Sequence, residues 1–156
     1  AVVASMLIVE MAAYYKKQNM TLFDAMEAMY KKYGYFIERV VSLVEEGIEG
    51  PARIAAMIDN IRNNCPKTLG GLSVDAVRDY TTGVIKYSDG MEKSTNQPKN
   101  NMLYLELADG NGWIAIRPSG TEPKLKLYFG YSNKDKNIAE ETIAELMRDT
   151  QEKIRG

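Results

Sequence analysis

The sequence predicts an α+β fold, in which a four-stranded antiparallel sheet carries two helices on one face and follows a separate helical segment. Two stretches, 51–64 and 136–155, place apolar side chains along one side of a helix. Between them lie four stretches with the composition or alternation of strands, and a turn rich in Gly and Asn joins two of these. Antiparallel strands with helices on one face form a two-layer α+β sandwich.

The first stretch, 2–18, predicts a helix with apolar side chains on nearly all sides. Such a helix needs partners around it. A bilayer span needs about 20 apolar residues, whereas Glu10 interrupts a shorter run here, and no basic segment precedes it as in a secretory signal. We therefore expect no membrane segment. We expect this helix to pack against the rest of a longer protein, or to self-associate with a second copy.

A second helix is predicted over 22–33, where apolar residues recur at helical spacing. Thr21 offers an N-cap, and Asp24 three positions later completes a variant of the capping box. Gly34 is a natural stop for this helix. A short strand is predicted over 38–44.

The polar segment 45–50 contains two glycines and predicts a hinge. We therefore divide the chain into two units. Residues 1–46 hold the two helices, the short strand and the hinge, and we expect them to be the remnant of a preceding α/β domain. Residues 47–156 form the C-terminal domain.

Within the second unit, Pro51 suits the first turn of a helix. The apolar stripe of this helix comprises Ile54, Met57, Ile58 and Ile61. Four strands are predicted, at 77–87, 102–107, 113–117 and 124–131. The polar stretch 88–101 predicts an exposed loop, and Asn133 or Asp135 can cap the last helix, 136–155.

The composition excludes several classes of function. Lys and Arg (20) nearly balance Asp and Glu (21), and the net charge of −1 argues against a nucleic-acid-binding protein, which would carry a basic surplus. The chain has no histidine and one cysteine, Cys65, which excludes histidine general-base chemistry, the usual zinc shells and an intrachain disulfide. A lone free cysteine fits a reducing compartment, and we expect a cytoplasmic protein.

The connection between the last two predicted strands, RPSGTEPK, carries groups that suit a phosphate. Arg117 can hold two phosphate oxygens with its planar guanidinium, and Ser119 and Thr121 can each donate a hydroxyl hydrogen bond. Gly120 would let the backbone adopt a positive φ, so that successive N–H groups form an anion nest. Lys126, farther along the following strand, adds a second positive charge.

By composition alone this segment could also be an ordinary loop without a binding role, because Ser, Gly, Thr and Pro are common in connections. The segment is also not a Walker-type phosphate loop. Upstream, the sequence DGNG at 109–112 has one carboxylate rather than the several that a metal loop uses, so it favours a hairpin turn. We assign no metal ligand in this chain.

The motif RPSGTEPK and its surroundings resemble the α-D-phosphohexomutases of the phosphoglucomutase/phosphomannomutase kind, whose last domain carries this signature. Other stretches that resemble the same family are DGNGW at 109–113, KLY at 126–128, DYxxG at 79–83, and RNNCP at 62–66 followed by Gly70-Gly71. Residues 1–36 resemble the closing helices of the third domain of these enzymes. The resemblance implies a C-terminal fragment with the TATA-binding-protein-like fold of the family's last domain.

The resemblance also implies a function. These enzymes interconvert hexose 1-phosphate and hexose 6-phosphate through a phosphoserine, with Mg²⁺ assisting. The C-terminal domain closes over the sugar and holds the phosphate that is not reacting. By this likeness Arg117, Ser119, Gly120 and Thr121 contact that phosphate, and so does Lys126, where some members place a basic residue.

The family's phosphoserine, metal and sugar-binding motifs do not occur in this sequence. We therefore expect no catalytic residue and no Mg²⁺ ligand here, and no activity without the N-terminal domains of the same protein. Two alternatives stay open. A phosphoglucosamine mutase is one, although those enzymes continue the motif as LIRVM rather than KLKLY; a stand-alone phosphate-binding or regulatory module is the other.

Overall fold

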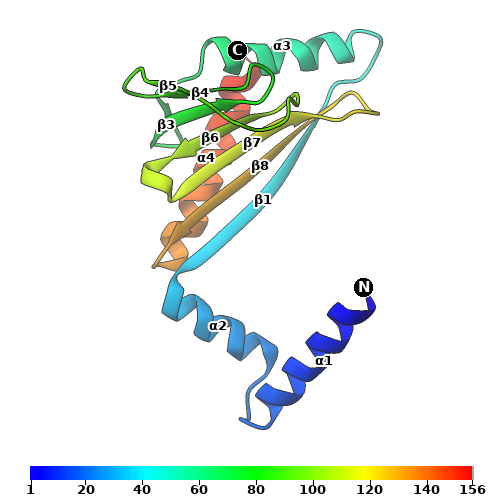
Figure 1. The fold of residues 1–156 in the computed structure, drawn as a ribbon, viewed down its shortest axis with the longest axis vertical. Helices are drawn as coiled ribbons and strands as arrows, with labels where there is room; N and C mark the ends of the chain where they lie inside the picture. Colours follow the sequence, from blue (N-terminus) through cyan, green and yellow to red (C-terminus); the bar gives the residue numbers. More distant parts are fainter. Residues whose placement is uncertain (156) are drawn as a thin grey trace.

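The computed structural model describes residues 1–155, apart from the side chain of Asp109 (Figure 1). Two helices, α1 (Val2–Lys16) and α2 (Leu22–Tyr33), precede an antiparallel sheet. None of the helices within these residues is long and apolar enough to cross a membrane.

The start of α2 follows the predicted capping box. The Thr21 hydroxyl accepts a hydrogen bond from the Asp24 amide at 3.2 Å, and the Asp24 carboxylate accepts one from the Thr21 amide at 2.8 Å. The Thr21 hydroxyl also lies 2.6 Å from the Asp24 carboxylate and donates to it, and this bond, together with the one from the Thr21 amide, lowers the pKa of the Asp24 carboxyl. Gly34 ends the helix with a φ of +104°, a conformation that favours glycine.

The sheet is eight-stranded and antiparallel, in the order β1-β8-β7-β6-β3-β4-β5, with β2 paired to β3. Its strands are β1 (Tyr35–Val44), β2 (Thr68–Leu69), β3 (Leu72–Asp79), β4 (Val84–Tyr87), β5 (Glu92–Ser94), β6 (Leu103–Leu107), β7 (Gly112–Pro118) and β8 (Lys124–Asn133). The α+β class is confirmed, but the predicted number of four strands is too low.

The extra strands have separate causes. The predicted strand 77–87 is a hairpin of β3 and β4, because Gly83 turns the chain with a φ of +80° and its amide bonds to the Asp79 carbonyl at 2.8 Å. Strand β5 lies in the predicted loop 88–101, where it pairs with β4 through entirely exposed residues. Strand β1 starts three residues before the predicted 38–44.

Strand β1 pairs with β8 over ten residues, from Tyr35 opposite Asn133 to Val44 opposite Lys124. The sheet of the C-terminal unit therefore extends to a strand that precedes the predicted hinge. The division of the chain at residues 46 and 47 stays a prediction.

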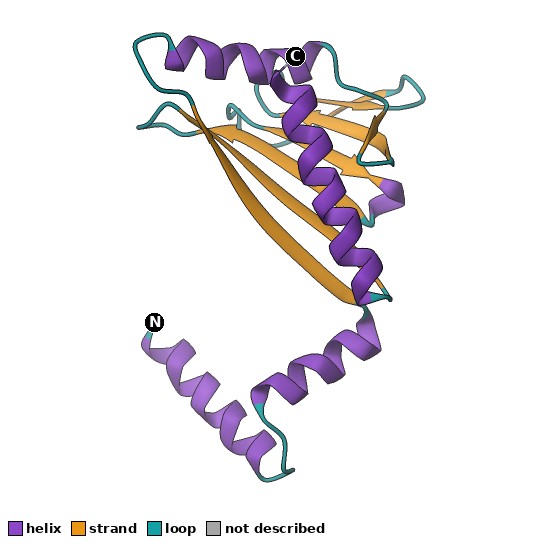
Figure 2. Cartoon of the chain, turned by 180° about the vertical axis from the view of Figure 1, so that it is seen from behind, coloured by secondary structure: helices purple, strands orange, loops and turns teal. Residues whose placement is uncertain are grey.

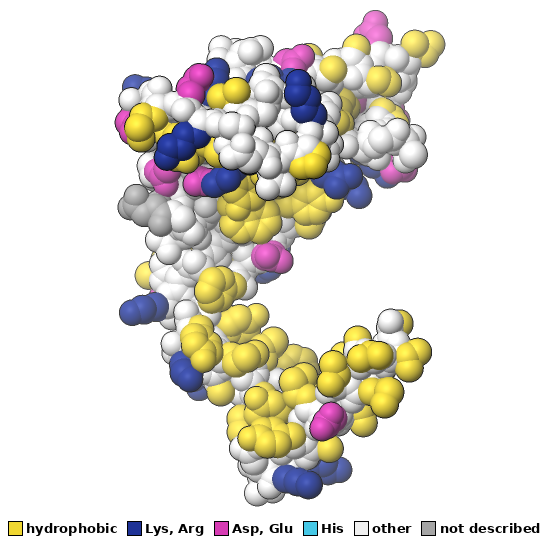
Figure 3. Space-filling view, in the orientation of Figure 1, with side chains coloured by type: hydrophobic (Ala, Val, Ile, Leu, Met, Phe, Trp, Pro, Cys, Tyr) yellow, Lys and Arg dark blue, Asp and Glu magenta, His cyan; other side chains and the backbone are white. Residues whose placement is uncertain are grey.

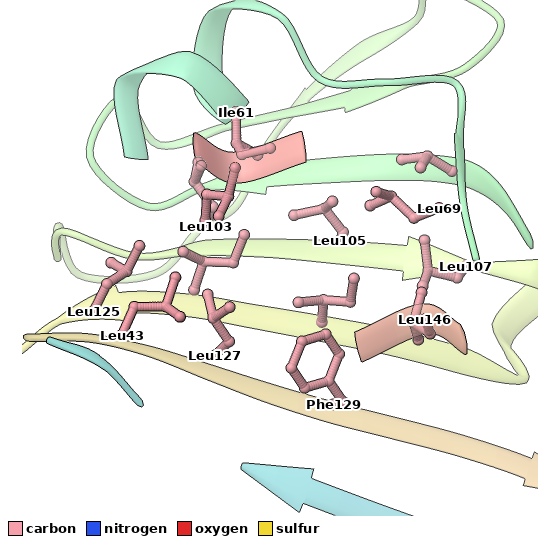
Figure 4. Packing of buried hydrophobic residues seen from close by; sticks show 14 of the residues in the cluster. Leu43, Ile61, Leu69, Leu103, Leu105, Leu107, Leu125, Leu127, Phe129 and Leu146 are labelled. Carbon is pink, nitrogen blue, oxygen red and sulfur yellow. The ribbon is translucent and has the colours of Figure 1, made fainter. Parts of the chain in front are cut away.

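Two helices, α3 (Gly50–Asn63) and α4 (Lys136–Arg155), pack on one face of the sheet (Figure 2). The Asp135 carboxylate caps α4, where it accepts hydrogen bonds from the amides of Asn137 at 2.8 Å and Ile138 at 3.2 Å. Apolar side chains of both helices meet those of β6, β7 and β8 in one core (Figure 4). The end of β7 and the start of β8 thereby lie beside the N-terminal end of α3.

The turn between β2 and β3 approaches α4 closely at Gly70, which has a φ of +54°. A Cβ at Gly70 would lie 2.5 Å from the Leu146 Cα. The Gly70 amide donates to the Asp149 carboxylate at 2.7 Å, and the Lys153 ammonium also contacts this carboxylate, at 2.9 Å. Although burial opposes ionisation, these two donors hold the pKa of Asp149 below its ordinary value.

Helix α1 has no buried residue. Most of its large apolar side chains are exposed, from Met11 at 45% to Val2 at 75%, and exposed apolar side chains of α2 add to them (Figure 3). This is the surface that the sequence predicts to need a partner.

Candidate phosphate-binding site

The predicted phosphate motif forms the connection between β7 and β8. It lies at the end of these strands, next to the segment that joins β1 to α3 (Figure 1). Residues 119–123 are the loop itself, since Pro118 ends β7 and Lys124 begins β8. Arg117 and Lys126 therefore belong to regular strands, which fix their positions.

Arg117 and Lys126 lie directly opposite each other in the register of β7 and β8. Their strand neighbours Ile116, Leu125 and Leu127 are fully buried beneath the helices. Because side chains alternate along a strand, both cations stand on the opposite, open face of the sheet.

Neither cation has an ion-pair partner among residues 1–155 whose side chains are described. Arg78 on the same open face differs, because it is paired with Glu106. Like charges directly opposite each other destabilise a sheet. The two unpaired cations therefore repel each other, and an anion between them would reduce this repulsion.

The loop adds the hydroxyl groups of Ser119 and Thr121, which make no hydrogen bond within the described part of the chain. The Ser119 amide donates to the Lys124 carbonyl at 2.8 Å, which closes the loop. The predicted nest of three amides is therefore wrong for Ser119. The amides of Gly120 and Thr121 stay without a backbone acceptor within the described residues.

The expected positive φ of Gly120 is also wrong, because Gly120 is absent from the positive-φ residues of the described chain. Two backbone hydrogen bonds, from the Ser119 amide to the Lys124 carbonyl and from the Lys124 amide to the Glu122 carbonyl, turn the chain without a positive φ at Gly120. A Cβ at Gly120 would meet nothing within 4 Å. Glycine thus leaves open space at the loop tip, where a ligand can approach the backbone.

Glu122 is the one carboxylate in the segment 117–126. The Lys124 ammonium lies 2.9 Å from it, and this hydrogen bond together with the charge of Lys124 lowers the pKa of Glu122. The pair is neutral as a whole. The net charge of the segment therefore comes from Arg117 and Lys126.

The chain before α3 supports the loop. The Glu45 amide donates to the Pro123 carbonyl at 3.0 Å. Gly50 packs against Glu45 and Pro123. A Cβ at Gly50 would overlap the Glu45 carbonyl and lie 3.3 Å from the Pro123 Cβ. The Arg53 guanidinium stabilises this segment, because it donates hydrogen bonds to the Glu45 carboxylate at 2.8 Å and to the Glu46 carbonyl at 2.6 Å.

A cavity of about 520 Å³ lies between the loop and α3. Residues that line it include Ile54, Ile58, Arg62, Asn101 and the loop 118–123. Arg117 and Lys126 do not line this cavity, because they stand on the open face of the sheet and α3 packs on the other face. The sequence does not predict that α3 borders the loop, because spacing along the chain does not reveal which helix end meets which loop.

Arg62 at the border of this cavity is not a free cation. It contacts Asp79 at 3.2 Å and Asp59, and it donates to Thr81 at 3.2 Å and Asn101 at 3.3 Å. These contacts join α3 to the turn after β3 and to the chain before β6. Arg62 therefore holds the wall of the cavity in place.

The side chains described within residues 1–155 contain no group of three or more His, Cys, Asp or Glu that could hold a metal ion. The carboxylate of Asp109, in the sequence that superficially resembles a metal loop, lies outside the described side chains. Burial raises the pKa of the Cys65 thiol to about 11, so this thiol stays protonated at neutral pH. The described side chains thus offer no cluster of three ligands to Mg²⁺.

Comparison with known proteins shows which family the chain resembles. Residues 105–148, which include the loop and both cations, match the C-terminal domain of the phosphoglucomutase/phosphomannomutase family. The chain is 38% identical over 123 residues to a phosphoglucomutase of Staphylococcus haemolyticus (strain JCSC1435). It is 39% identical over 123 residues to a phosphoglucomutase of Staphylococcus aureus (strain bovine RF122 / ET3-1).

Each of these matches covers 78% of the chain and 22% of the relative, so the chain spans about a fifth of the length of the curated relatives it matches. The family match of residues 105–148 includes β7, β8 and the loop between them. The chain therefore belongs to the phosphoglucomutase/phosphomannomutase family, of which it carries the C-terminal domain.

Proposed function

We propose that the segment 117–126 binds the phosphate group of a hexose phosphate. The observation that carries this proposal is the unpaired couple Arg117 and Lys126, opposite each other on the open face. A phosphate carries about −1.5 to −2 charges at neutral pH, which matches the two positive charges of the couple. The hydroxyls of Ser119 and Thr121 and the amides of Gly120 and Thr121 supply further donors.

The scaffold supports binding with little reorganisation. Strands β7 and β8 fix both cations, and the segment 45–50 braces the loop from outside. Ordering of a flexible loop would reduce affinity, so a braced loop leaves more of the interaction energy for the ligand. The Lys124–Glu122 pair neutralises the one carboxylate that would repel the anion.

In the whole protein, we propose a phosphohexomutase that interconverts hexose 1-phosphate and hexose 6-phosphate, with Mg²⁺ held outside this chain. The phosphoglucomutase relatives support this assignment. The role of this domain is to hold the phosphate that is not reacting and to close over the sugar. Binding energy from a remote group then orients the reacting end. The chain alone is inactive in this proposal.

An amide NMR titration of the chain with glucose 1-phosphate tests the binding role, with inorganic phosphate and glucose as controls. Both phosphates should shift amide signals within and beside residues 117–126, and glucose should not. Signals that stay unchanged at millimolar phosphate, or that shift equally with glucose, would contradict the proposal.

We also propose that the apolar surface of α1 is a contact surface, for the other domains of the same protein or for a second copy of this chain. The support is that none of its residues is buried while its apolar side chains are exposed. Sedimentation at increasing concentration should show a dimer of the isolated chain. A strictly monomeric profile at high concentration would contradict self-association.

A further inference from the structure

Strand β1 places a third polar side chain in line with the two cations. Ser42 lies directly opposite Lys126 in the register of β1 and β8, and Lys126 lies opposite Arg117 in the register of β8 and β7. Since directly opposite residues share a face, all three side chains stand on the open face of the sheet. No local signal in the sequence marks Ser42, because only the pairing of β1 with β8 brings it next to Lys126.

The Ser42 hydroxyl is available to a ligand. Ser42 is exposed, and no hydrogen bond involves its hydroxyl within the described residues. Its neighbours on the same face of β1 are Val40 and Val44, which are 58% and 48% exposed and have no polar group to offer. Ser42 is therefore a single polar position in an apolar part of this strand face.

The row is too long for one phosphate. Adjacent strands lie about 4.8 Å apart, so the backbones of Ser42 and Arg117 are separated by about 10 Å. Arginine and lysine side chains are long and can converge on an anion beside the loop, whereas the short Ser42 side chain remains above β1. A ligand that uses the whole row has an anionic group at the Arg117 end and a hydroxyl group at the Ser42 end.

We propose that Ser42 contacts a hydroxyl group of the sugar whose phosphate is held by Arg117 and Lys126. The ligand class is a phosphorylated polyhydroxy compound that lies across β7, β8 and β1. This inference rests on the proposed phosphate-binding function and adds to it a residue that distinguishes a sugar phosphate from a free phosphate ion. A serine hydroxyl suits the task because it both donates and accepts hydrogen bonds.

The test compares two ligands, glucose 1-phosphate and inorganic phosphate, by isothermal titration of the chain. Removal of one hydrogen bond of this kind corresponds to a loss of roughly two- to twelvefold in affinity. Ser42→Ala should therefore weaken glucose 1-phosphate within this range and leave inorganic phosphate within about twofold of the wild-type value. Ser42→Thr retains a hydroxyl and suits a strand, so it should keep the wild-type preference.

Arg117→Ala separates the two proposals, because it should weaken both ligands. Unchanged glucose 1-phosphate binding in Ser42→Ala, with both ligands weakened by Arg117→Ala, would overturn the role of Ser42 and leave the phosphate site standing. An equal loss of both ligands in Ser42→Ala would also overturn the sugar contact. If Arg117→Ala leaves both affinities unchanged, or the wild-type chain binds neither ligand, the phosphate site itself is wrong.

Discussion

The close approach of Gly70 to α4 gives a prediction whose size follows from the structure. In Gly70→Ala the new Cβ would lie 2.5 Å from the Leu146 Cα and 2.7 Å from its amide nitrogen, so α4 or the turn must shift. A non-glycine residue at positive φ costs about 1–2 kcal/mol, and forced repacking of a filled core costs about 1–3 kcal/mol. Gly70→Ala should therefore lower the free energy of unfolding by about 2–5 kcal/mol.

The adjacent glycine is a matched control. Gly71 also has a positive φ, +77°, but a Cβ there would meet nothing within 4 Å. Gly71→Ala should therefore cost only the conformational part, about 1–2 kcal/mol. Urea unfolding followed by the fluorescence of Trp113, the single tryptophan, measures both variants from within β7. Equal losses in the two variants would refute the packing of this turn against α4.

Two further predictions concern α4. The hydroxyl of Thr150 is buried without a hydrogen-bond partner in the described chain, so Thr150→Val should raise the free energy of unfolding by about 1 kcal/mol. The control Thr142→Val, at a half-buried position, should change it by less than about 0.5 kcal/mol. Urea midpoints measure both variants, and no gain in Thr150→Val would contradict the prediction. Because the pKa of Asp149 is lowered in the folded state, its contribution is fully present above the unfolded value of about 3.9 and is lost as pH falls through the folded value. Urea midpoints of wild type and Asp149→Asn should therefore converge as pH falls from 6 to 2, and a constant difference would contradict the assignment.

Local signals in the sequence predicted the helices well. The apolar periodicity predicted the observed bounds of α4, where Asp135, one of the two predicted caps, is the cap in the structure, and Thr21 with Asp24 predicted the start of α2. These features depend on side chains a few residues apart, which the sequence displays directly. The loop was also predicted from its residue types, and the structure places it between β7 and β8.

Pairing between distant segments could not be predicted in the same way. Strand β5 has three exposed polar residues, Glu92–Ser94, so it has no alternation to reveal it. The partnership of β1 with β8 depends on register between residues about 80–100 positions apart. The conformation of Gly120 was wrongly predicted because glycine permits a positive φ without requiring it.

We propose that Arg117 and Lys126 form one anion site on the open face. The dissociation constant of inorganic phosphate, measured for wild type and for the variant Arg117→Gln at one fixed ionic strength, tests this claim. Charge-assisted contacts contribute about 1.5–3 kcal/mol each, so the variant should bind at least about tenfold more weakly. Equal dissociation constants for the two proteins would contradict the claim.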